Sequence, residues 1–457
     1  MIDKELISKY NVAGPRYTSY PPANRFSEEF GEEDYINILK SSNEKQPHNI
    51  SLYFHVPFCP RICHFCGCNT SLCADNDTVE NYFSAVIEEM EKVSSYLDLK
   101  RRVTQIHWGG GTPNSIPFSY IDKLMGLLLS RFSISPGAEV AIECSPAYLE
   151  LNDIDDLREM GFNRLSIGVQ DFNPEVLKRL NRLPLRYPVE NICRKADEAG
   201  FKGVNIDLIY GLPGQKFDDF IRSVKRVVEI SPERVVTFSY AHVPWFKENQ
   251  KRAEKYRIPP ADEKLKMLEV SFDILTGAGY QAIGMDHYAK PGDELYKALQ
   301  RKELRRNFQG YCTRETTGQV YAFGATAISQ LTEGYSQNVR SVNEYIDSVN
   351  SCHLPVMRGY VLDDKEKIVR KVITEIMCNH FVDFAEIAED YGIASEELKE
   401  ILELHTDKIQ PFIDDGLVEY GGGRLRVLPA GFFLIRNIAM ALDPALDRGG
   451  NQYSKTI

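Results

Sequence analysis

The sequence predicts an α/β protein built on parallel strands. Six apolar segments before residue 245 are bounded by turn residues, and the stretches between them repeat apolar residues at three- and four-residue steps. Strand and helix therefore alternate, which indicates parallel strands joined by right-handed crossovers. The pattern alone fits an open doubly wound sheet, a full barrel or a partial barrel.

The predicted strands are SLYFHVPF (51–58), TQIHWGG (104–110), EVAIECSP (139–146), RLSIGVQ (164–170), GVNIDLIYGLP (203–213) and RVVTFSYAH (234–242). Helical periodicity is clearest in residues 120–132, 154–162, 192–201 and 218–230. Polar residues and glycines gather where the strands end, at 109–112, 143, 170–171, 207 and 242. Barrel active sites are built at that edge, although exposed strand ends also collect polar groups for solubility.

The pattern changes after residue 245. A charged helical region at 261–279 leads into loop-like segments, and a helix-rich tail begins near Asp363. Residues 362–378 predict a capped amphipathic helix, a second helix starts near Ser395, and LVEYGGGRLRVLP (417–429) predicts a hairpin. Helices followed by a hairpin are typical of winged-helix DNA-binding domains. Residues 363–420, however, hold 16 acidic and 6 basic side chains, which favours a packing or lid role.

Composition excludes several classes of protein. The 457 residues are 43% apolar and 26% charged, as in ordinary globular chains, and the net charge of −11 offers no general attraction for nucleic acid or anionic lipid. The opening MIDKELISKY lacks an apolar signal core, and GFFLIRNIAMAL (431–442) is too short to span a membrane. We therefore expect a cytoplasmic protein with reduced thiols, no nucleic-acid partner and no membrane span.

Five of the ten cysteines lie within fifteen residues, namely Cys59, Cys63, Cys66, Cys68 and Cys73. The first three form C-x3-C-x2-C directly after the first predicted strand. Thiolates select zinc or iron–sulfur clusters, and no distant C-x2-C or H-x3-H pair is present to complete a structural zinc site. Three cysteines on a four-iron cluster would leave one iron free for another ligand, unless Cys68 or Cys73 supplies a fourth thiolate.

Several motifs together resemble a known family. C-x3-C-x2-C after the first strand and GGGTP after the second resemble the radical S-adenosylmethionine (SAM) superfamily. Within it, CPRICHFCGCN, GPRYTSYP (14–21), GVQDFN (168–173), NIDLIYGLP (205–213) and RNFQGY (306–311) are similar to oxygen-independent coproporphyrinogen III oxidase. The resemblance spans nearly the whole chain.

The resemblance implies a partial (β/α)6-type radical SAM barrel. It implies an amino-terminal arm (1–34), a catalytic barrel with its extension (35–338) and a mostly helical carboxy-terminal lid domain (339–457). The implied reaction is oxidative decarboxylation of two propionates of coproporphyrinogen III to vinyl groups, giving protoporphyrinogen IX. A 4Fe-4S cluster and two SAM molecules would serve as cofactors, and the hydrogen-abstracting species would be a 5′-deoxyadenosyl radical.

The resemblance also implies roles for particular residues. Cys59, Cys63 and Cys66 would bind the cluster, with Cys68 a non-ligand. Tyr53 and His55 would face the lumen beside it, unless they form a core pair. The implied SAM contacts are Gly109, Gly110, Gly111 and Glu143 for the first molecule, and Phe65, Gly111, Thr112, Gln170, Arg182, Asp207 and Ala241 for the second, with Ile328 as an apolar wall. Asp207 lies in an otherwise apolar strand, where a carboxylate needs a ligand or a structural partner.

Candidates for the propionate contacts are Arg16, Arg305 and Arg306, together with His55; each arginine could instead be an ordinary surface charge. Two positions depart from the family pattern. Cys144-Ser145-Pro146 stands where Val-Asp-Pro is usual, and Arg305 stands where His is expected. The alternatives are a haem-carrying relative, a radical SAM enzyme acting on another tetrapyrrole, and a structural zinc protein. A reductant such as a flavodoxin or ferredoxin is the implied protein partner.

Overall fold

The computed structural model describes residues 4–72, 75–316, 318–446, 453 and 455–456. They form two compact units. The sheet unit comprises residues 26–259 and 315–361, and the terminal unit comprises residues 1–25, 260–314 and 362–457. Cys73 lies outside the described residues.

The sheet unit contains a ten-strand run in the order β16-β15-β14-β13-β1-β4-β5-β6-β7-β8. Its strands are β1 (Ile50–Val56), β4 (Arg102–Gly110), β5 (Ser133–Cys144), β6 (Arg164–Gln170), β7 (Gly203–Tyr210), β8 (Arg234–Ser239), β13 (Gln319–Phe323), β14 (Ile328–Gln330), β15 (Gly334–Asn338) and β16 (Val356–Val361). Pairing is parallel from β13 through β8 and antiparallel from β13 to β16. All six predicted strands are present.

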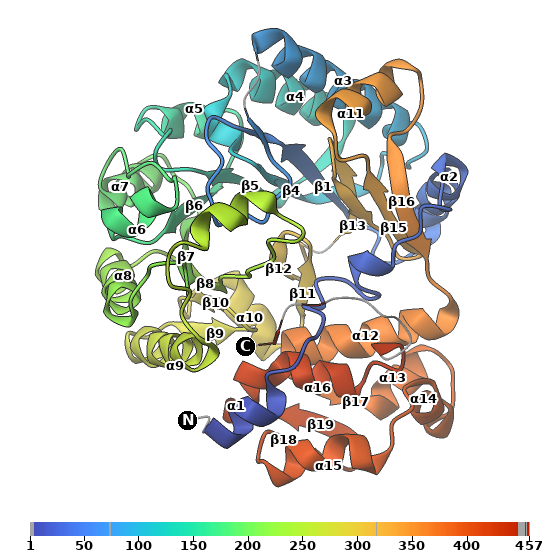
Figure 1. Ribbon diagram of the computed structural model, residues 1–457. Coiled ribbons are helices and arrows are strands. Elements are labelled where there is room, and N and C mark those ends of the chain that lie inside the picture. Colours follow the sequence, from blue (N-terminus) through green and yellow to red (C-terminus); the bar gives the residue numbers. More distant parts are fainter. Residues whose placement is uncertain (1–3, 73–74, 317, 447–452, 454, 457) are drawn as a thin grey trace. The chain divides into compact units, whose positions relative to one another are not determined.

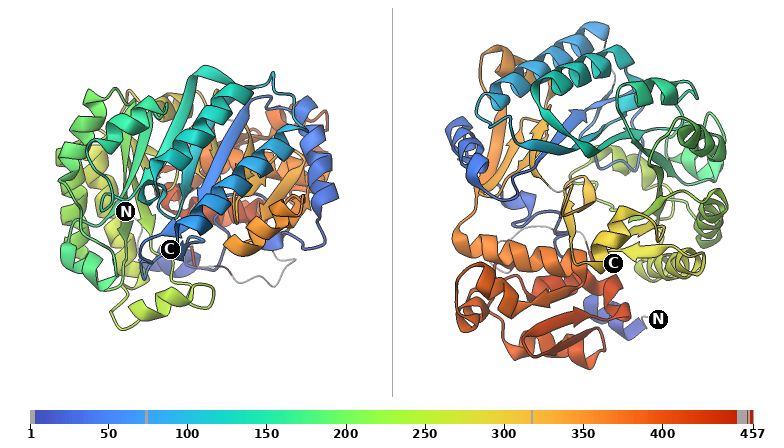
Figure 2. Two further views of the ribbon diagram at one scale, coloured as in Figure 1. Left: turned by 90° about the horizontal axis from the view of Figure 1, so that it is seen from above. Right: turned by 180° about the vertical axis from the view of Figure 1, so that it is seen from behind.

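Helices alternate with the parallel strands of the sheet unit, as predicted, and two further helices lie before β1 and before β16. They are α2 (Glu32–Ser41), α3 (Asn76–Ser94), α4 (Phe118–Arg131), α5 (Asp153–Glu159), α6 (Pro174–Arg179), α7 (Val189–Glu198), α8 (Phe217–Ile230) and α11 (Val342–Asn350), with short turns η2 (Ser42–Glu44), η3 (Pro113–Ser115) and η4 (Glu248–Ala253). Figure 1 shows the arc of β1 and β4 to β8 with α3, α4, α5, α7 and α8 on its outer side, and Figure 2 shows the same ring of helices from behind. This architecture is the predicted partial (β/α)6 barrel.

Side chains along β1 and β4 point alternately to two faces of the sheet, and one face forms the core of the sheet unit while the other carries the site. Phe54 stacks on Trp108 at a ring-centre distance of 4.8 Å and on Phe323 at 5.3 Å, and all three are fully buried. Truncating such an aromatic ring costs about 3–5 kcal/mol. Because successive side chains on a strand point to opposite faces, Tyr53 and His55 lie on the other face of β1. The hydrophobic core therefore fixes which side chains are available for chemistry.

The terminal unit has a helical and hairpin architecture. Its elements are α1 (Lys4–Tyr10), η1 (Ala23–Arg25), α9 (Ala261–Gly277), β9 (Gln281–Ile283), β10 (His287–Ala289), α10 (Glu294–Gln300), β11 (Leu304–Asn307), β12 (Gly310–Thr313), α12 (Asp364–Asn379), β17 (Phe381–Asp383), α13 (Phe384–Asp390), α14 (Ser395–Ile401), α15 (Thr406–Asp414), β18 (Val418–Gly421), β19 (Arg424–Val427), η5 (Pro429–Leu434) and α16 (Ile435–Ala441). The predicted cap is present: Asp363 accepts from the Glu366 N–H at 2.7 Å and donates its own N–H to Glu366 at 3.0 Å. The predicted glycine turn joins β18 to β19.

One sequence interpretation was wrong. Residues 280–361 were predicted to be loop-like beyond the helix at 261–279, and they instead form strands β9 to β16 and two helices. Many of these strands are only three to five residues long and carry polar side chains. Their stability comes from neighbouring strands rather than from their own pattern, so local sequence does not reveal them.

Candidate active site

The loop of predicted cluster cysteines begins directly after β1 in the sheet unit. Cys59 lies in β2 (Phe58–Cys59), which pairs with β3 (Ser71–Leu72), and its Sγ is 3.2 Å from Thr112 Oγ1. The backbone N–H groups of Gly111 and Thr112 donate to the carbonyls of Val56, at 2.7 Å, and Phe58, at 2.9 Å. The loop after β4 is thereby bonded to the start of the cysteine loop.

Side chains from two further segments hold the backbone of the cysteine loop. Asn181, which has a φ of 57°, donates its side-chain amide to the Ile62 carbonyl at 2.9 Å. Asn249 in η4 donates to the carbonyls of Cys63 at 3.0 Å and Cys66 at 3.1 Å. Sequence reasoning missed both asparagines, because an isolated Asn carries no pattern and the segments become neighbours only on folding.

The cysteines of the loop lie within electrostatic reach of one another. Burial raises the pKa of the Cys59 thiol to about 11 and also raises that of Cys63, whose Sγ lies 3.7 Å from the Arg182 guanidinium. A hydrogen bond from Cys68 lowers the pKa of Cys66. The three predicted ligands therefore differ in their surroundings, and metal binding would release the protons of Cys59 and Cys63, whose pKa values are raised.

The donor set fits an iron–sulfur cluster. Three soft sulfur ligands on one loop, with a cation beside them, are the chemistry that such a cluster requires. Among the described residues, no three His, Cys, Asp or Glu side chains are arranged around a single metal-ion position. The nine described cysteines are all free thiols.

Each glycine of the GGG motif is required by a different neighbour. A Cβ on Gly109 would lie 2.7 Å from the Glu143 carboxylate, and one on Gly110 would lie 2.6 Å from the His55 ring. A Cβ on Gly111 would lie 2.7 Å from the backbone oxygens of Pro57 and Phe58. Gly110 also has a φ of 116°, a conformation that favours glycine. The motif thus lets the backbone of one strand end approach three parts of the site.

Tyr53 and His55 form a hydrogen-bonded pair. His55 Nε2 lies 3.0 Å from the Asn69 carbonyl, which can only accept, so Nε2 carries the proton. Nδ1 is then the acceptor for the Tyr53 hydroxyl at 3.0 Å. Burial lowers the pKa of His55 and raises that of Tyr53, so both side chains are held neutral.

Glu143 lies at the end of β5 and faces His107. His107 Nε2 is 3.0 Å from one carboxylate oxygen, and the Gly110 N–H donates to the other at 3.3 Å. Burial alone would raise the pKa of Glu143, but His107 and the Gly110 N–H lower it below its ordinary value. The side chain keeps 42% of its surface exposed, so an ionised carboxylate is available to a cationic ligand. His107, which stacks on Tyr53, was not among the predicted residues.

A second polar group lies on β6 and β7. Asp207 accepts from Ser166 at 3.1 Å and from the Asn205 amide at 2.7 Å, so it has the structural partners that its strand requires. Gln170 has a φ of 71°, and its side-chain oxygen is buried without a hydrogen-bond partner. The side-chain oxygen of Asn205 is likewise buried and lacks a partner. A buried acceptor without a protein partner is costly unless a ligand or a water molecule donates to it, so these two oxygens can accept from a bound ligand.

Arg182 connects this group to the cysteine loop. One guanidinium nitrogen donates to the Gly168 carbonyl, and the guanidinium lies 6.0 Å from the centre of the Phe65 ring. Gln250 ties the same loop to the end of β8 by donating to the carbonyls of Phe65 at 3.1 Å and Ala241 at 3.2 Å. All predicted cluster and SAM residues, including half-buried Ile328 at the start of β14, therefore belong to the sheet unit.

The three predicted substrate arginines belong to the terminal unit. Arg305 is partly buried, pairs with Glu375 at 3.3 Å and donates to the Leu304 carbonyl at 2.9 Å. Arg306 donates to the Arg16 carbonyl at 3.4 Å, and its Nε is buried without a partner. Arg16 and Arg306 are thus neighbours, whereas Arg305 is occupied by an acidic side chain.

Positive charge is concentrated around Arg16. Burial and the charges of Arg16 and Arg436 lower the pKa of Lys264 in α9 to about 8. Burial alone would raise the pKa of Asp286, but His287, Arg306 and Arg16 bring it down to about 2. Lys264 was not predicted from sequence. The cluster is suited to holding carboxylate groups.

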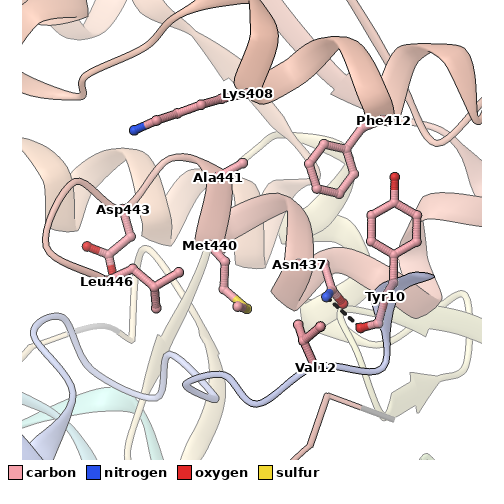
Figure 3. A pocket seen from close by; sticks show the side chains of 9 residues that line it. All are labelled: Tyr10, Val12, Lys408, Phe412, Asn437, Met440, Ala441, Asp443 and Leu446. Carbon is pink, nitrogen blue, oxygen red and sulfur yellow. Dashed lines mark hydrogen bonds between the residues drawn. The ribbon is translucent and has the colours of Figure 1, made fainter. Parts of the chain in front are cut away.

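The cavity in Figure 3 lies elsewhere in the terminal unit. It has a volume of about 300 Å³ and is bounded by Tyr10 and Val12, by Phe412 of α15, and by Asn437 and Met440 of α16, among others. None of the predicted site residues lines it. It is therefore not part of the candidate active site.

The sheet unit and its cysteine loop define a radical SAM protein. Residues 53–227 match the model of the Radical SAM superfamily, and residues 362–434 match that of the HemN C-terminal domain. The chain is 39% identical over 458 residues to oxygen-independent coproporphyrinogen III oxidase of Escherichia coli (100% of this chain, 98% of the relative), and 37% identical to that of Synechocystis (98% and 96%). The solved structure of coproporphyrinogen III oxidase (HemN) from Escherichia coli has a TM-score of 0.89, with 36% identity and coverage of 98% of this chain and 99% of that chain.

The chain belongs to the oxygen-independent coproporphyrinogen III oxidase family. Membership of the radical SAM superfamily implies a 4Fe-4S cluster and SAM. In the part of the chain that the structure describes, no helix combines the length and apolar character needed to cross a bilayer.

Proposed function

We propose that this protein converts two propionate side chains of coproporphyrinogen III into vinyl groups and so produces protoporphyrinogen IX. The single observation that carries the proposal is family membership over the whole chain, at 39% identity and with coverage of 100% of this chain. The structure supports it by presenting three thiols, a fixed carboxylate and unsatisfied acceptors in one unit.

Cys59, Cys63 and Cys66 would hold the cluster, and Cys68 would remain outside it. The spacing C-x3-C-x2-C, which places three thiols on one loop directly after β1, supports this division. Bound together, the cluster and SAM supply a one-electron cleavage of the sulfonium and a radical that removes hydrogen from the propionate β-carbon. The remaining work of the protein is to position both reactants and exclude water.

Glu143 and the glycine motif would position the first SAM. An ionised Glu143, fixed by His107 and the Gly110 N–H, suits the ammonium group of the methionine moiety. Gly109 lets the Glu143 carboxylate approach the end of β4, and Gly111 lets the cysteine loop approach the same strand end, so both would keep these parts of the SAM site close together. Neutral Tyr53 and His55 would line the lumen, with His55 also a candidate substrate contact.

A second SAM would bind beside β6 and β7. The unsatisfied oxygen of Gln170 supports this placement, since it needs a donor such as a ribose hydroxyl or an amine. Asp207 and Arg182 would add charged contacts, while Phe65, Gly111, Thr112, Ala241 and Ile328 complete the wall. The hydrogen bonds of Asp207 to Ser166 and Asn205 would orient its carboxylate.

Arg16 and Arg306 are the better candidates for propionate contacts. Arg306 has an unsatisfied buried Nε, and Arg16 lies within a cluster of positive charge. Arg305 pairs with Glu375 and would have to leave it to bind substrate, so it is the weakest of the three candidates. In this proposal residues 1–34 act as an arm, 35–338 as the catalytic barrel with its extension, and 339–457 as a lid. The compact units group residues 1–25 and 260–314 with the carboxy-terminal part instead.

The protein would work in the cytoplasm with a flavodoxin or ferredoxin as reductant.

The test is an anaerobic assay of cluster-reconstituted protein with SAM, dithionite and coproporphyrinogen III. Mass spectrometry should detect both 5′-deoxyadenosine and the divinyl product. Deoxyadenosine without divinyl product would contradict the substrate and favour another tetrapyrrole. Tight stoichiometric haem binding with neither product would favour the haem-carrier alternative. A Glu143→Gln variant should retain cluster absorbance and bind SAM about tenfold more weakly, since a charge-assisted hydrogen bond is lost.

A further inference from the structure

Two exposed aromatic side chains adjoin the cysteine loop of the sheet unit. Trp245 is 61% exposed and Phe246 is 57% exposed, in the segment that follows β8. Leu72, the strand partner of Cys59, is 64% exposed. Large side chains such as these are normally buried, so their grouping near one loop needs a reason.

This segment is bonded to the cysteine loop. Lys247 donates to the Cys68 carbonyl at 2.9 Å, and Asn249 donates to the carbonyls of two cluster cysteines. The Arg340 guanidinium lies 5.4 Å from the centre of the Phe246 ring, and the Arg340 carbonyl accepts from Asn69 at 3.0 Å. A protein that touches Trp245 and Phe246 would therefore be within a few residues of the cluster ligands.

The same segment is basic in an acidic protein. Residues 245–257, WFKENQKRAEKYR, carry five basic and two acidic side chains, whereas the whole chain has a net charge of −11. Lys251, Arg252, Lys255 and Arg257 are exposed, as is Arg61 within the cysteine loop. We call residues 245–257 the basic aromatic segment.

We propose that the basic aromatic segment is the docking surface for an acidic one-electron carrier protein, of the flavodoxin or ferredoxin kind. The proposal rests on the proposed function, which requires one electron to enter the cluster for each SAM cleaved. In the step, the carrier loses one electron and the cluster gains it, with no other group transferred. Basic residues steer an acidic partner, and exposed aromatic side chains supply contact area for a small, transient interface.

The shape of the surface favours a protein over the tetrapyrrole substrate. A small molecule needs a concave site that buries most of its surface. Trp245 and Phe246 each keep more than half of their surface exposed, and four basic side chains of the segment are exposed as well. A protein partner can cover such a surface without entering a pocket.

The test uses two double variants and a matched control in the full-length, cluster-loaded protein. Trp245→Ser with Phe246→Ser removes the aromatic contact, and Lys251→Glu with Arg252→Glu reverses the charge. Leu129→Ser with Lys123→Glu on α4 makes the same kinds of change at exposed positions remote in sequence. None of these residues was assigned to the cluster, SAM or substrate.

Binding of a reduced bacterial flavodoxin is measured first, by biolayer interferometry at two salt concentrations. We expect each double variant to bind about tenfold more weakly than the wild type, and the control to bind within about twofold of it. Wild-type affinity should fall with added salt, and the charge-reversed variant should lose most of that dependence. Unchanged affinity in both variants would overturn the proposal. Because this readout needs no turnover, it tests the surface even if the proposed function fails.

Turnover then separates docking from damage to the site. With flavodoxin as donor, deoxyadenosine formation should fall about tenfold in both variants, whereas with dithionite it should match the wild type. A loss with both reductants would overturn the proposal and assign the segment to support of the cysteine loop. A wild-type protein that yields deoxyadenosine but no divinyl product would contradict the proposed function alone.

Discussion

Glu89 in α3 is a buried acid whose ionisation should make the stability of the sheet unit depend on pH. Its side chain is 1% exposed and accepts hydrogen bonds from Tyr345 at 2.6 Å, from the Gly324 N–H at 2.9 Å and from Asn338 at 2.6 Å. Burial raises the pKa of Glu89 to about 7, against the lowering effect of those bonds. Gly324 also lies close to the His55 backbone, so the acid supports a segment beside the site.

The size of the effect on stability follows from the pKa of Glu89 in the unfolded chain and its pKa in the folded protein. A difference of one pKa unit corresponds to about 1.4 kcal/mol, so a rise from 4.5 to about 7 corresponds to about 3 kcal/mol. The folded protein holds the proton more tightly than the unfolded chain. This contribution is therefore fully present below pH 4.5 and is lost as the pH rises through about 7.

The assay compares the wild type with Glu89→Gln, which cannot ionise. Urea unfolding is followed by tryptophan fluorescence, in which buried Trp108 reports the loss of the core, at pH 5 and pH 8.5. Glu88→Gln on the exposed face of the same helix is the control. The free energy of unfolding of Glu89→Gln relative to the wild type should rise by about 2.5 kcal/mol between the two pH values, because the contribution is already slightly reduced at pH 5, while the control should show little change. A constant difference would refute the reasoning, because it would mean that Glu89 has an ordinary pKa.

Three further predictions concern the site and the arm. Replacing any of the three cluster cysteines with Ala should abolish iron–sulfur absorbance of the reconstituted protein, whereas Cys68→Ala should retain it; loss in Cys68→Ala would make Cys68 a ligand. In Gly110→Ala the alanine must adopt the positive φ of Gly110, and its Cβ meets the His55 ring; the strained backbone costs about 1–3 kcal/mol. SAM affinity measured by equilibrium dialysis should therefore fall at least about tenfold. Arg436→Ala removes hydrogen bonds to the carbonyls of residues 14 and 15, so trypsin should cleave at Arg16 about tenfold faster, and an unchanged rate would show that other contacts hold the arm.

Sequence pattern was sufficient for the sheet of the barrel. Each of β1 and β4 to β8 is an apolar run between turn residues, and alternation with amphipathic helices leaves parallel crossovers as the consistent topology. The Asp363 cap and the glycine turn at 421–423 were likewise local signals, because a cap or a turn is formed by neighbours in the chain.

The short strands β9 to β16 were not predictable in the same way. β13, for example, pairs in parallel with β1, which lies more than 260 residues earlier in the chain. Its register is decided by that partner and by the residues packed around it, and no window of local sequence contains either.

The sequence by itself determined the family, the cluster cysteines and the strand ends at which the chemistry gathers, because those features are short motifs in fixed local order. Only the tertiary structure decided how the residues are used. It joined Glu143 to His107, left the Gln170 oxygen unsatisfied and occupied Arg305 with Glu375. Hydrogen bonds and charge pairs depend on distance in space, and residues far apart in the chain acquire a fixed distance only when the core has packed.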